Sequence, residues 1–138
     1  MIKQLGVIPD LCVEDYILCF FKDLNIQAKS VSALDPTLAK FHNLKVLNLS
    51  FNCISKIEFI PPNLEELYLN GNQINEVSLN FNKPINSLIH IGLSMNKIRQ
   101  TALSCIVKAF PNLFCLDISF NELTDMESAL TWCKQLAS

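Results

Sequence analysis

The side chains in this sequence with the most chemical potential are a glutamate, a histidine and a cysteine at matching positions of a repeated pattern. Glu66, His90 and Cys115 hold equivalent places in three copies of that pattern, so we expect them on neighbouring strands roughly 4.8 Å apart. An imidazole beside a thiol and a carboxylate could activate the sulfur as a nucleophile. However, outward strand positions are exposed by default, and the sequence supplies no oxyanion hole or pocket around them. We therefore predict that the protein is not an enzyme.

Motifs for metals, cofactors and small-molecule substrates are missing from the sequence. It has no Gly-rich phosphate loop, no His-Glu-x-x-His motif and no Cys-x-x-Cys pair. The other histidine, His42, precedes a predicted strand and is expected to be a plain surface residue. The sequence therefore predicts no metal site, no cofactor and no small-molecule substrate.

Cysteine usage and the N-terminal segment indicate the compartment. The six cysteines are scattered along the chain: Cys12, Cys19, Cys53, Cys105, Cys115 and Cys133. Pro9, Asp10 and Glu14 interrupt the N-terminal segment, so it lacks the apolar run of a signal peptide. We therefore expect reduced thiols in the cytoplasm, mostly packed as small buried hydrophobes.

Composition limits the classes of partner. The chain has 138 residues, of which 50% are hydrophobic and 17% charged, and its net charge is −2. This is enough for one domain with a sizeable core, but it does not provide the basic face that nucleic acid or an anionic membrane would need. No apolar run approaches the roughly 18 residues of a membrane span. We predict neither nucleic acid nor a membrane as a partner.

A short pattern of apolar residues followed by asparagine organises the chain. One copy consists of Leu44, Leu47, Leu49, Asn52, Ile54 and Ile57. Further copies begin at Leu64, Leu88 and Leu113, and a degenerate copy begins at Phe21. The starts are 23, 20, 24 and 25 residues apart, which is typical of repeats that each contain one strand and one return segment.

Each copy predicts one short strand and one inward turn. Leu47 and Leu49 are separated by one residue, so they point to the same side of a strand, into a core. Successive strands then stack as a parallel sheet. An asparagine at the turn can pair with backbone groups that burial would otherwise leave unsatisfied. We expect a structural ladder of four such residues: Asn52, Asn72, Asn96 and Asn121.

The segments between the strands differ in composition. Pro61 and Pro62 predict an extended connection, residues 75–87 an irregular one, and residues 101–110 a helix. Helical periodicity in the flanking segments predicts covers for both ends of the stack. We therefore predict an N-terminal arm and capping helix over residues 1–20, about five repeats over 21–126, and a C-terminal capping helix over 127–138.

The spelling L-x-x-L-x-L-x-x-N-x-I-x-x-I resembles the leucine-rich repeat superfamily, in the intracellular subclass of a protein phosphatase 1 regulatory subunit. This resemblance implies an α/β fold: a short horseshoe solenoid with a parallel concave sheet of about five strands and a mixed irregular and helical convex side. The stretches 34–36, 64–72, 90–93 and 110–125 look like one family member that is associated with ciliated cells. That likeness implies a location in the cilium or flagellum axoneme, and it brings no established catalytic residues.

The side chains between the core leucines are the candidate binding residues. We expect them on the concave face, with Tyr68 near its middle and Gly92 leaving a dip beside it. The candidates are Val46, Asn48, Glu66, Tyr68, His90, Gly92, Cys115 and Asp117. Our leading hypothesis is a non-catalytic scaffold that binds a protein partner there. The alternative, by analogy with the phosphatase regulator, is a regulatory subunit of an enzyme such as a Ser/Thr phosphatase.

Apolar residues directly precede three of the ladder asparagines: Phe51, Met95 and Phe120. They could form a small stripe along one edge of the sheet. Isolated exposed apolar residues need no explanation, whereas a contiguous patch indicates an interaction site. The sequence leaves packing and binding open for this stripe and favours packing.

Overall fold

The structure is a computed structural model that describes residues 13–79, 81–125, 127, 130, 131 and 134. In this part of the chain five short strands alternate with return segments, and a helix precedes the first strand. In chain order the elements are α1 (Val13–Phe20), β1 (Asp23–Asn25), the 3-10 helix η2 (Pro36–Lys40), β2 (Val46–Asn48), β3 (Glu66–Tyr68), η3 (Val77–Leu79), β4 (His90–Gly92), η4 (Gln100–Ala102), α2 (Leu103–Ala109) and β5 (Cys115–Asp117). No helix among the described residues is long and apolar enough to cross a bilayer.

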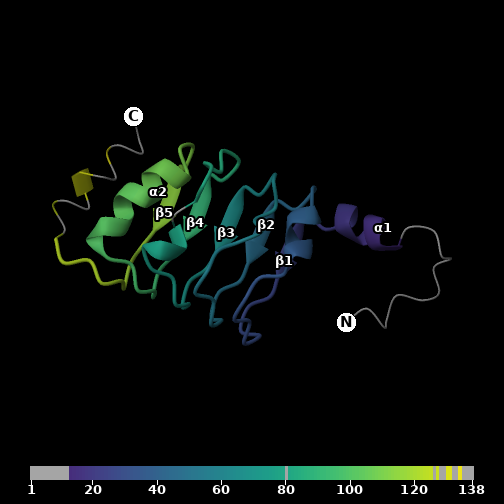
Figure 1. Ribbon diagram of the computed structural model, residues 1–138, viewed down its shortest axis with the longest axis horizontal. Coiled ribbons are helices and arrows are strands. Elements are labelled where there is room, and N and C mark those ends of the chain that lie inside the picture. Colours follow the sequence, from purple (N-terminus) through teal and green to yellow (C-terminus); the bar gives the residue numbers. More distant parts are fainter. Residues whose placement is uncertain (1–12, 80, 126, 128–129, 132–133, 135–138) are drawn as a thin grey trace.

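The strands form one parallel sheet in which each neighbour in space is also the next strand in the chain. The order is β1-β2-β3-β4-β5, and Figure 1 shows the strands side by side in this order along the long axis of the molecule. The central residues of β2, β3 and β4 (Leu47, Leu67 and Ile91) pair in register. A solenoid with the predicted parallel sheet of about five strands is therefore confirmed. The horseshoe curvature and the concave position of the sheet stay predictions.

The core lies on one side of this sheet and is filled by the apolar residues of the repeat pattern. Leu47, Leu67 and Ile91 are at most 1% exposed, which is worth roughly 1.5–3 kcal/mol for each side chain relative to an exposed position. The equivalent residues of the outer strands, Leu24 and Leu116, are only half-buried. Burial falls at both ends because a terminal repeat has a neighbour on one side only.

The return segments follow the predicted differences with one correction. The helix expected over 101–110 is present as η4 followed by α2, and it ends before Pro111. The segment after β2, which contains Pro61 and Pro62, has no regular structure. The segment expected to be irregular over 75–87 contains η3, because the Asn75 side chain accepts the N–H groups of Val77 and Ser78 and starts a helical turn.

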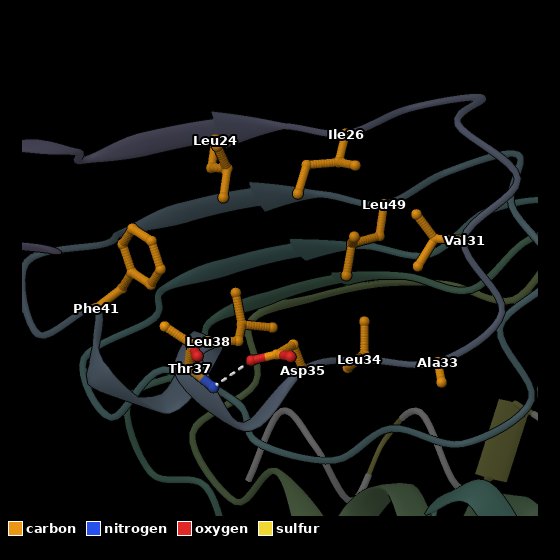
Figure 2. A pocket seen from close by; sticks show the side chains of 10 residues that line it. All are labelled: Leu24, Ile26, Val31, Ala33, Leu34, Asp35, Thr37, Leu38, Phe41 and Leu49. Atoms are coloured by element: carbon orange, nitrogen blue, oxygen red, sulfur yellow. Dashed lines mark hydrogen bonds between the residues drawn. The ribbon is translucent and has the colours of Figure 1, made fainter. Parts of the chain in front are cut away.

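At the N-terminal end, α1 lies next to the first repeat, beyond the β1 end of the sheet (Figure 1). Leu18 of α1 is buried, and the Asn43 side-chain amide donates to the carbonyl of Cys19 at 2.8 Å. An apolar cavity of about 350 Å³ nevertheless remains at the first repeat, lined by ten residues between Leu24 and Leu49 and by none from α1 (Figure 2). The predicted arm before α1, and most of the helix predicted over 127–138, lie outside the described residues.

Asparagine side chains join each repeat to the one before it. Oδ1 of Asn72 accepts the N–H of Ile54 at 2.9 Å, and its amide donates to the carbonyls of Leu49 at 3.1 Å and Leu69 at 3.0 Å. The same three bonds recur at 2.8–3.0 Å for the other three residues, Asn52, Asn96 and Asn121. Each asparagine therefore satisfies backbone groups of two repeats at once.

Replacing Asn72 with alanine should lower the free energy of unfolding by about 1–3 kcal/mol, because the buried N–H of Ile54 loses its acceptor and the carbonyls of Leu49 and Leu69 each lose one of two asparagine donors. Chemical denaturation of purified protein measures the loss. Lys97→Ala is the matched control, since this exposed side chain directly follows a ladder asparagine and its loss should stay within about 0.5 kcal/mol. Equal losses for the two variants would contradict the role of the ladder.

Candidate partner-binding face

Outward side chains from the five strands form one surface of the sheet, opposite the core. We call this surface the sheet face and define it by the strand residues Asp23, Asn25, Val46, Asn48, Glu66, Tyr68, His90, Gly92, Cys115 and Asp117. All eight residues predicted as binding candidates therefore belong to it. The outward residues of β2 and β3 are half-buried, and those of β5 are exposed.

Tyr68 is fixed near the centre of the sheet face. Its hydroxyl donates a hydrogen bond of 2.8 Å to Oε2 of Glu66, and its ring centroid lies 4.9 Å from that of His90, with 55° between the planes. The bond to Glu66 is the main reason that the pKa of Tyr68 is raised, and burial and the nearby acidic groups add to it. The phenol is thus held from two sides in an orientation that leaves it half-exposed.

Glu66, His90 and Cys115 lie next to one another because β3, β4 and β5 pair in register. The structure therefore brings together the three groups that could do chemistry. In the described structure, however, the Glu66 carboxylate bonds to Tyr68 rather than to the imidazole. A nucleophilic relay needs the acid to orient the histidine, so this arrangement is better suited to presenting polar groups than to activating the thiol.

The prediction that the cysteines are mostly buried is wrong for the four that the structure describes. Cys19, Cys53 and Cys115 are exposed, Cys105 is partly buried, and all four are free thiols. Position in the repeat decides their exposure, because Cys53 follows a ladder asparagine and Cys115 points outward from β5. Among the described side chains, no three His, Cys, Asp or Glu residues are arranged to hold a metal ion.

In β2 and β5 the second outward residue accepts hydrogen bonds from the turn that follows the strand. Oδ1 of Asp117 accepts the backbone N–H of Ser119 at 3.0 Å and its hydroxyl at 2.7 Å. The backbone bond is the main reason that the pKa of Asp117 is lowered, and the charge of His90 acts in the same direction. Asn48 accepts the N–H of Ser50 in the same way. These side chains hold the turns as well as facing solvent.

Gly92 does not leave the open dip that the sequence suggested. It is buried, because the Asn70 side chain of the preceding repeat lies over it and accepts the N–H and the hydroxyl of Ser94, both at 3.0 Å. A Cβ atom on Gly92 would stand 2.8 Å from Oδ1 of Asn70. Asn70 thus supplies the acceptor that glycine lacks, a role the sequence analysis missed. The signal in the sequence was Gly92 itself, because two other repeats carry a hydrogen-bond acceptor, Asn48 or Asp117, at the equivalent position.

Residues with left-handed backbone conformation run along the sheet just beyond the carboxyl ends of the strands. Phe51, Gly71, Met95 and Phe120 have φ angles of 56°, 63°, 55° and 52°. The N–H groups of the first three donate to the next repeat at 2.7–2.9 Å, which holds this backbone in place. A left-handed conformation costs residues other than glycine about 1–2 kcal/mol.

The three apolar members of this row are exposed. Phe51, Met95 and Phe120 are 50%, 53% and 84% exposed, and we call them the apolar ridge. The Phe51 ring lies over Gly71, where an added Cβ atom would be 2.6 Å from its Cδ1. Packing between neighbouring repeats therefore explains in part why position 51 carries a phenylalanine. It does not explain the exposure of Met95 and Phe120.

The bond between Tyr68 and Glu66 can be tested by titrating the phenol. In a Tyr16→Phe background, where Tyr68 is the remaining tyrosine, Glu66→Gln should lower the pKa of Tyr68, because the neutral amide accepts a weaker hydrogen bond and removes a negative charge. Ultraviolet absorbance of the tyrosinate reports the pKa. Glu65→Gln is the control, since Glu65 pairs with Lys45, and a similar drop in that variant would contradict the assignment.

The raised pKa of Tyr68 also predicts a pH dependence of stability. The phenol holds its proton more tightly in the folded state, so its contribution is present below the unfolded pKa of about 10 and is lost as the pH rises through the folded pKa. Unfolding midpoints measured across the alkaline range should fall less steeply in Tyr68→Phe than in the unchanged protein. Equal slopes would contradict this linkage.

The packing of Asn70 over Gly92 predicts that a second pair of substitutions restores the stability lost on replacing Gly92 with alanine. Gly92→Ala should destabilise the fold by about 1 kcal/mol, because displacing Asn70 leaves the Ser94 N–H without its acceptor. The double variant Gly92→Asn/Asn70→Ala should regain stability, since an asparagine at 92 can accept from Ser94 as Asn48 accepts from Ser50. Chemical denaturation compares them, and a double variant less stable than Gly92→Ala would contradict the explanation.

Known proteins share this repeat pattern. A family model described as "Leucine rich repeat" matches residues 22–74. The chain is 34% identical over 140 residues to human "Leucine-rich repeat-containing protein 43" and 34% identical over 134 residues to its mouse counterpart. These alignments cover 98% and 94% of this chain but only 21% and 20% of those relatives. Lumican of Gallus gallus is 30% identical over 93 residues, which cover 67% of this chain and 27% of lumican.

The comparisons confirm the likeness predicted from the local stretches, since Leucine-rich repeat-containing protein 43 is the relative that they resemble. The chain spans about a fifth of the length of that relative. Repeats of this kind generally serve as non-catalytic protein-interaction modules. The family match, the identity to these relatives and the stacked strand-and-asparagine repeats together show that the chain belongs to the leucine-rich repeat family.

Proposed function

We propose that this chain is a non-catalytic scaffold that binds a protein partner on the sheet face. The observation that carries the proposal is Tyr68, which is half-exposed near the centre of the face and fixed by Glu66 and His90. Tyrosine is enriched among the residues that dominate interface energies. A side chain that is already ordered also loses less conformational entropy when a partner binds.

In this proposal the sheet lines the concave side of a short horseshoe, and the partner contacts several adjacent strands. The contact residues are Val46, Asn48, Glu66, Tyr68, His90, Cys115 and Asp117, with Asn70 in place of the buried Gly92. Residues 21–126 supply the repeats, and the segments 1–20 and 127–138 cover their ends. No cofactor, small-molecule substrate, nucleic acid or membrane takes part, and the three carboxylates of the face argue against an anionic partner.

We also propose that the protein acts in the cytoplasm, in the cilium or flagellum axoneme. The support is the likeness to Leucine-rich repeat-containing protein 43, the family member associated with ciliated cells. The chain spans only about a fifth of that relative. The partners and the location are therefore proposed for this chain and not for the whole relative.

Regulation of a Ser/Thr phosphatase is the alternative function. Its support is the repeat spelling shared with the phosphatase regulator, which is an analogy at the level of the fold. A phosphatase assay with and without the protein discriminates between the two functions. An unchanged rate and unchanged substrate preference would remove the regulatory function.

A pull-down from ciliated cells tests the sheet face directly. The unchanged protein should enrich axonemal or trafficking proteins, and Glu66→Ala/Tyr68→Ala should lose them. Truncating a hot-spot residue costs about 2 kcal/mol or more, so affinity for the recovered protein should fall by at least about thirtyfold.

The matched control removes the same residue types away from the sheet face. Glu58 lies in a return segment and Tyr16 on α1, and both are exposed. The variant Tyr16→Ala/Glu58→Ala should therefore recover the same partners as the unchanged protein. If Glu66→Ala/Tyr68→Ala recovers them equally well, the partner does not bind on the sheet face.

A further inference from the structure

We infer that the segment bound by this chain is a cationic amphipathic helix of the partner protein, with apolar residues on the apolar ridge and Lys or Arg residues on the sheet face. The inference rests on the proposed function and specifies the chemistry of its partner. It comes from the backbone conformation and the spacing of the ridge, which the proposed function does not use, and from the charges beside it.

Folding alone does not account for the side chains of the ridge. Their turns require a left-handed residue, which glycine adopts most easily, and Gly71 shows that the position accepts glycine. Phe51, Met95 and Phe120 hold the same conformation against a steric penalty and also expose apolar surface. Two unfavourable features at the same repeat position are better explained by contact with another molecule than by the stability of this one.

The spacing of the ridge matches an α-helix that crosses the strands. Neighbouring strands are about 4.8 Å apart, so Phe51 and Met95 are separated by about 10 Å and Met95 and Phe120 by about 5 Å. A helix rises about 1.5 Å per residue, and its residues i, i+7 and i+11 lie on one face at about these intervals. An extended segment would repeat about every 7 Å on one side, which fits neither interval.

The charges beside the ridge determine the polar side of that helix. The sheet face carries the carboxylates of Asp23, Glu66 and Asp117 and no Lys or Arg. Glu66 and Asp117 lie two strands apart and are offset by two residues along the strands, about 12 Å in all. Lys or Arg residues at i and i+7 of the helix, about 10.5 Å apart along its axis, can therefore reach both with their long side chains. A helix with acidic residues there would be repelled.

The test uses two alanine-based helical peptides of about 18 residues, long enough to be partly helical in water. Both carry leucines at i, i+7 and i+11; one has lysines on the adjacent positions and the other has glutamates. Fluorescence anisotropy with the complete chain should show at least about tenfold tighter binding of the lysine peptide. This preference should weaken as salt is added, because exposed charges are screened.

The ridge variant is Met95→Asn/Phe120→Asn, in which asparagine tolerates the left-handed backbone. It should bind the lysine peptide at least about tenfold more weakly while its unfolding midpoint stays the same or rises. Phe114→Asn is the matched control, since Phe114 is 95% exposed at the opposite end of β5, and its binding should not change. If peptide binding depended on exposed phenylalanine in general, both variants would bind more weakly, and this result would overturn the inference.

The charge variant is Glu66→Gln/Asp117→Asn. Asparagine at 117 keeps an Oδ1 acceptor for Ser119, as Asn48 does for Ser50, so the turn is preserved. Binding of the lysine peptide should fall at least about fivefold, whereas Glu58→Gln, outside the face, should leave it unchanged. Equal binding of the two peptides, or binding of neither, overturns the inference.

The outcomes separate this inference from the proposed function. If Glu66→Ala/Tyr68→Ala abolishes the pull-down but the ridge variant binds normally, the sheet face binds a partner of another kind and only the inference fails. If Glu66→Ala/Tyr68→Ala leaves the pull-down intact, the proposed function fails. A dimer in sedimentation analysis that the ridge variant dissociates would show that a second copy covers the ridge, and this also overturns the inference.

Discussion

The hydrogen bonds of four asparagine side chains, of which Asn52, Asn72 and Asn96 are buried and Asn121 is partly exposed, hold this structure together. Each turn brings backbone groups into the core, where an unsatisfied N–H or C=O costs about 1–3 kcal/mol. Asn72 and its counterparts satisfy these groups in their own repeat and in the preceding one. Because every asparagine reaches back by one repeat, the strands must stack in register. This register places Glu66, His90 and Cys115 side by side.

The ladder also separates the residues that build the fold from those that face a partner. Core positions such as Leu47 and Leu67 must remain apolar, and the ladder positions must supply both a donor and an acceptor. The residue before each of the first three asparagines has its backbone fixed by an N–H bond to the next repeat, which leaves its side chain free to vary. Phe51, Gly71 and Met95 show this variation within one chain.

The strands, the core and the helix of the last return segment could be predicted from the sequence because each depends on spacing within a single repeat. Contacts between repeats could not be predicted in the same way. The packing of Asn70 over Gly92 depends on two residues 22 positions apart and on the missing Cβ of the glycine, which makes room for the Asn70 side chain. The cysteines are less buried than their apolar character predicts, because Cys53 and Cys115 follow the exposure of their positions in the repeat.

The fall in burial from the middle of the sheet to its ends has a consequence for local unfolding. Leu47, Leu67 and Ile91 are sealed between neighbours, whereas Leu24 borders the apolar cavity of the first repeat (Figure 2). Opening free energies in a stack of repeats depend on the interfaces that each unit shares. We therefore expect the outer repeats to exchange their amide hydrogens through small, local fluctuations, and β3 to exchange through openings of larger cooperative units. Tyr68 lies on β3, so the centre of the sheet face is expected to keep its structure when β1 and β5 open locally.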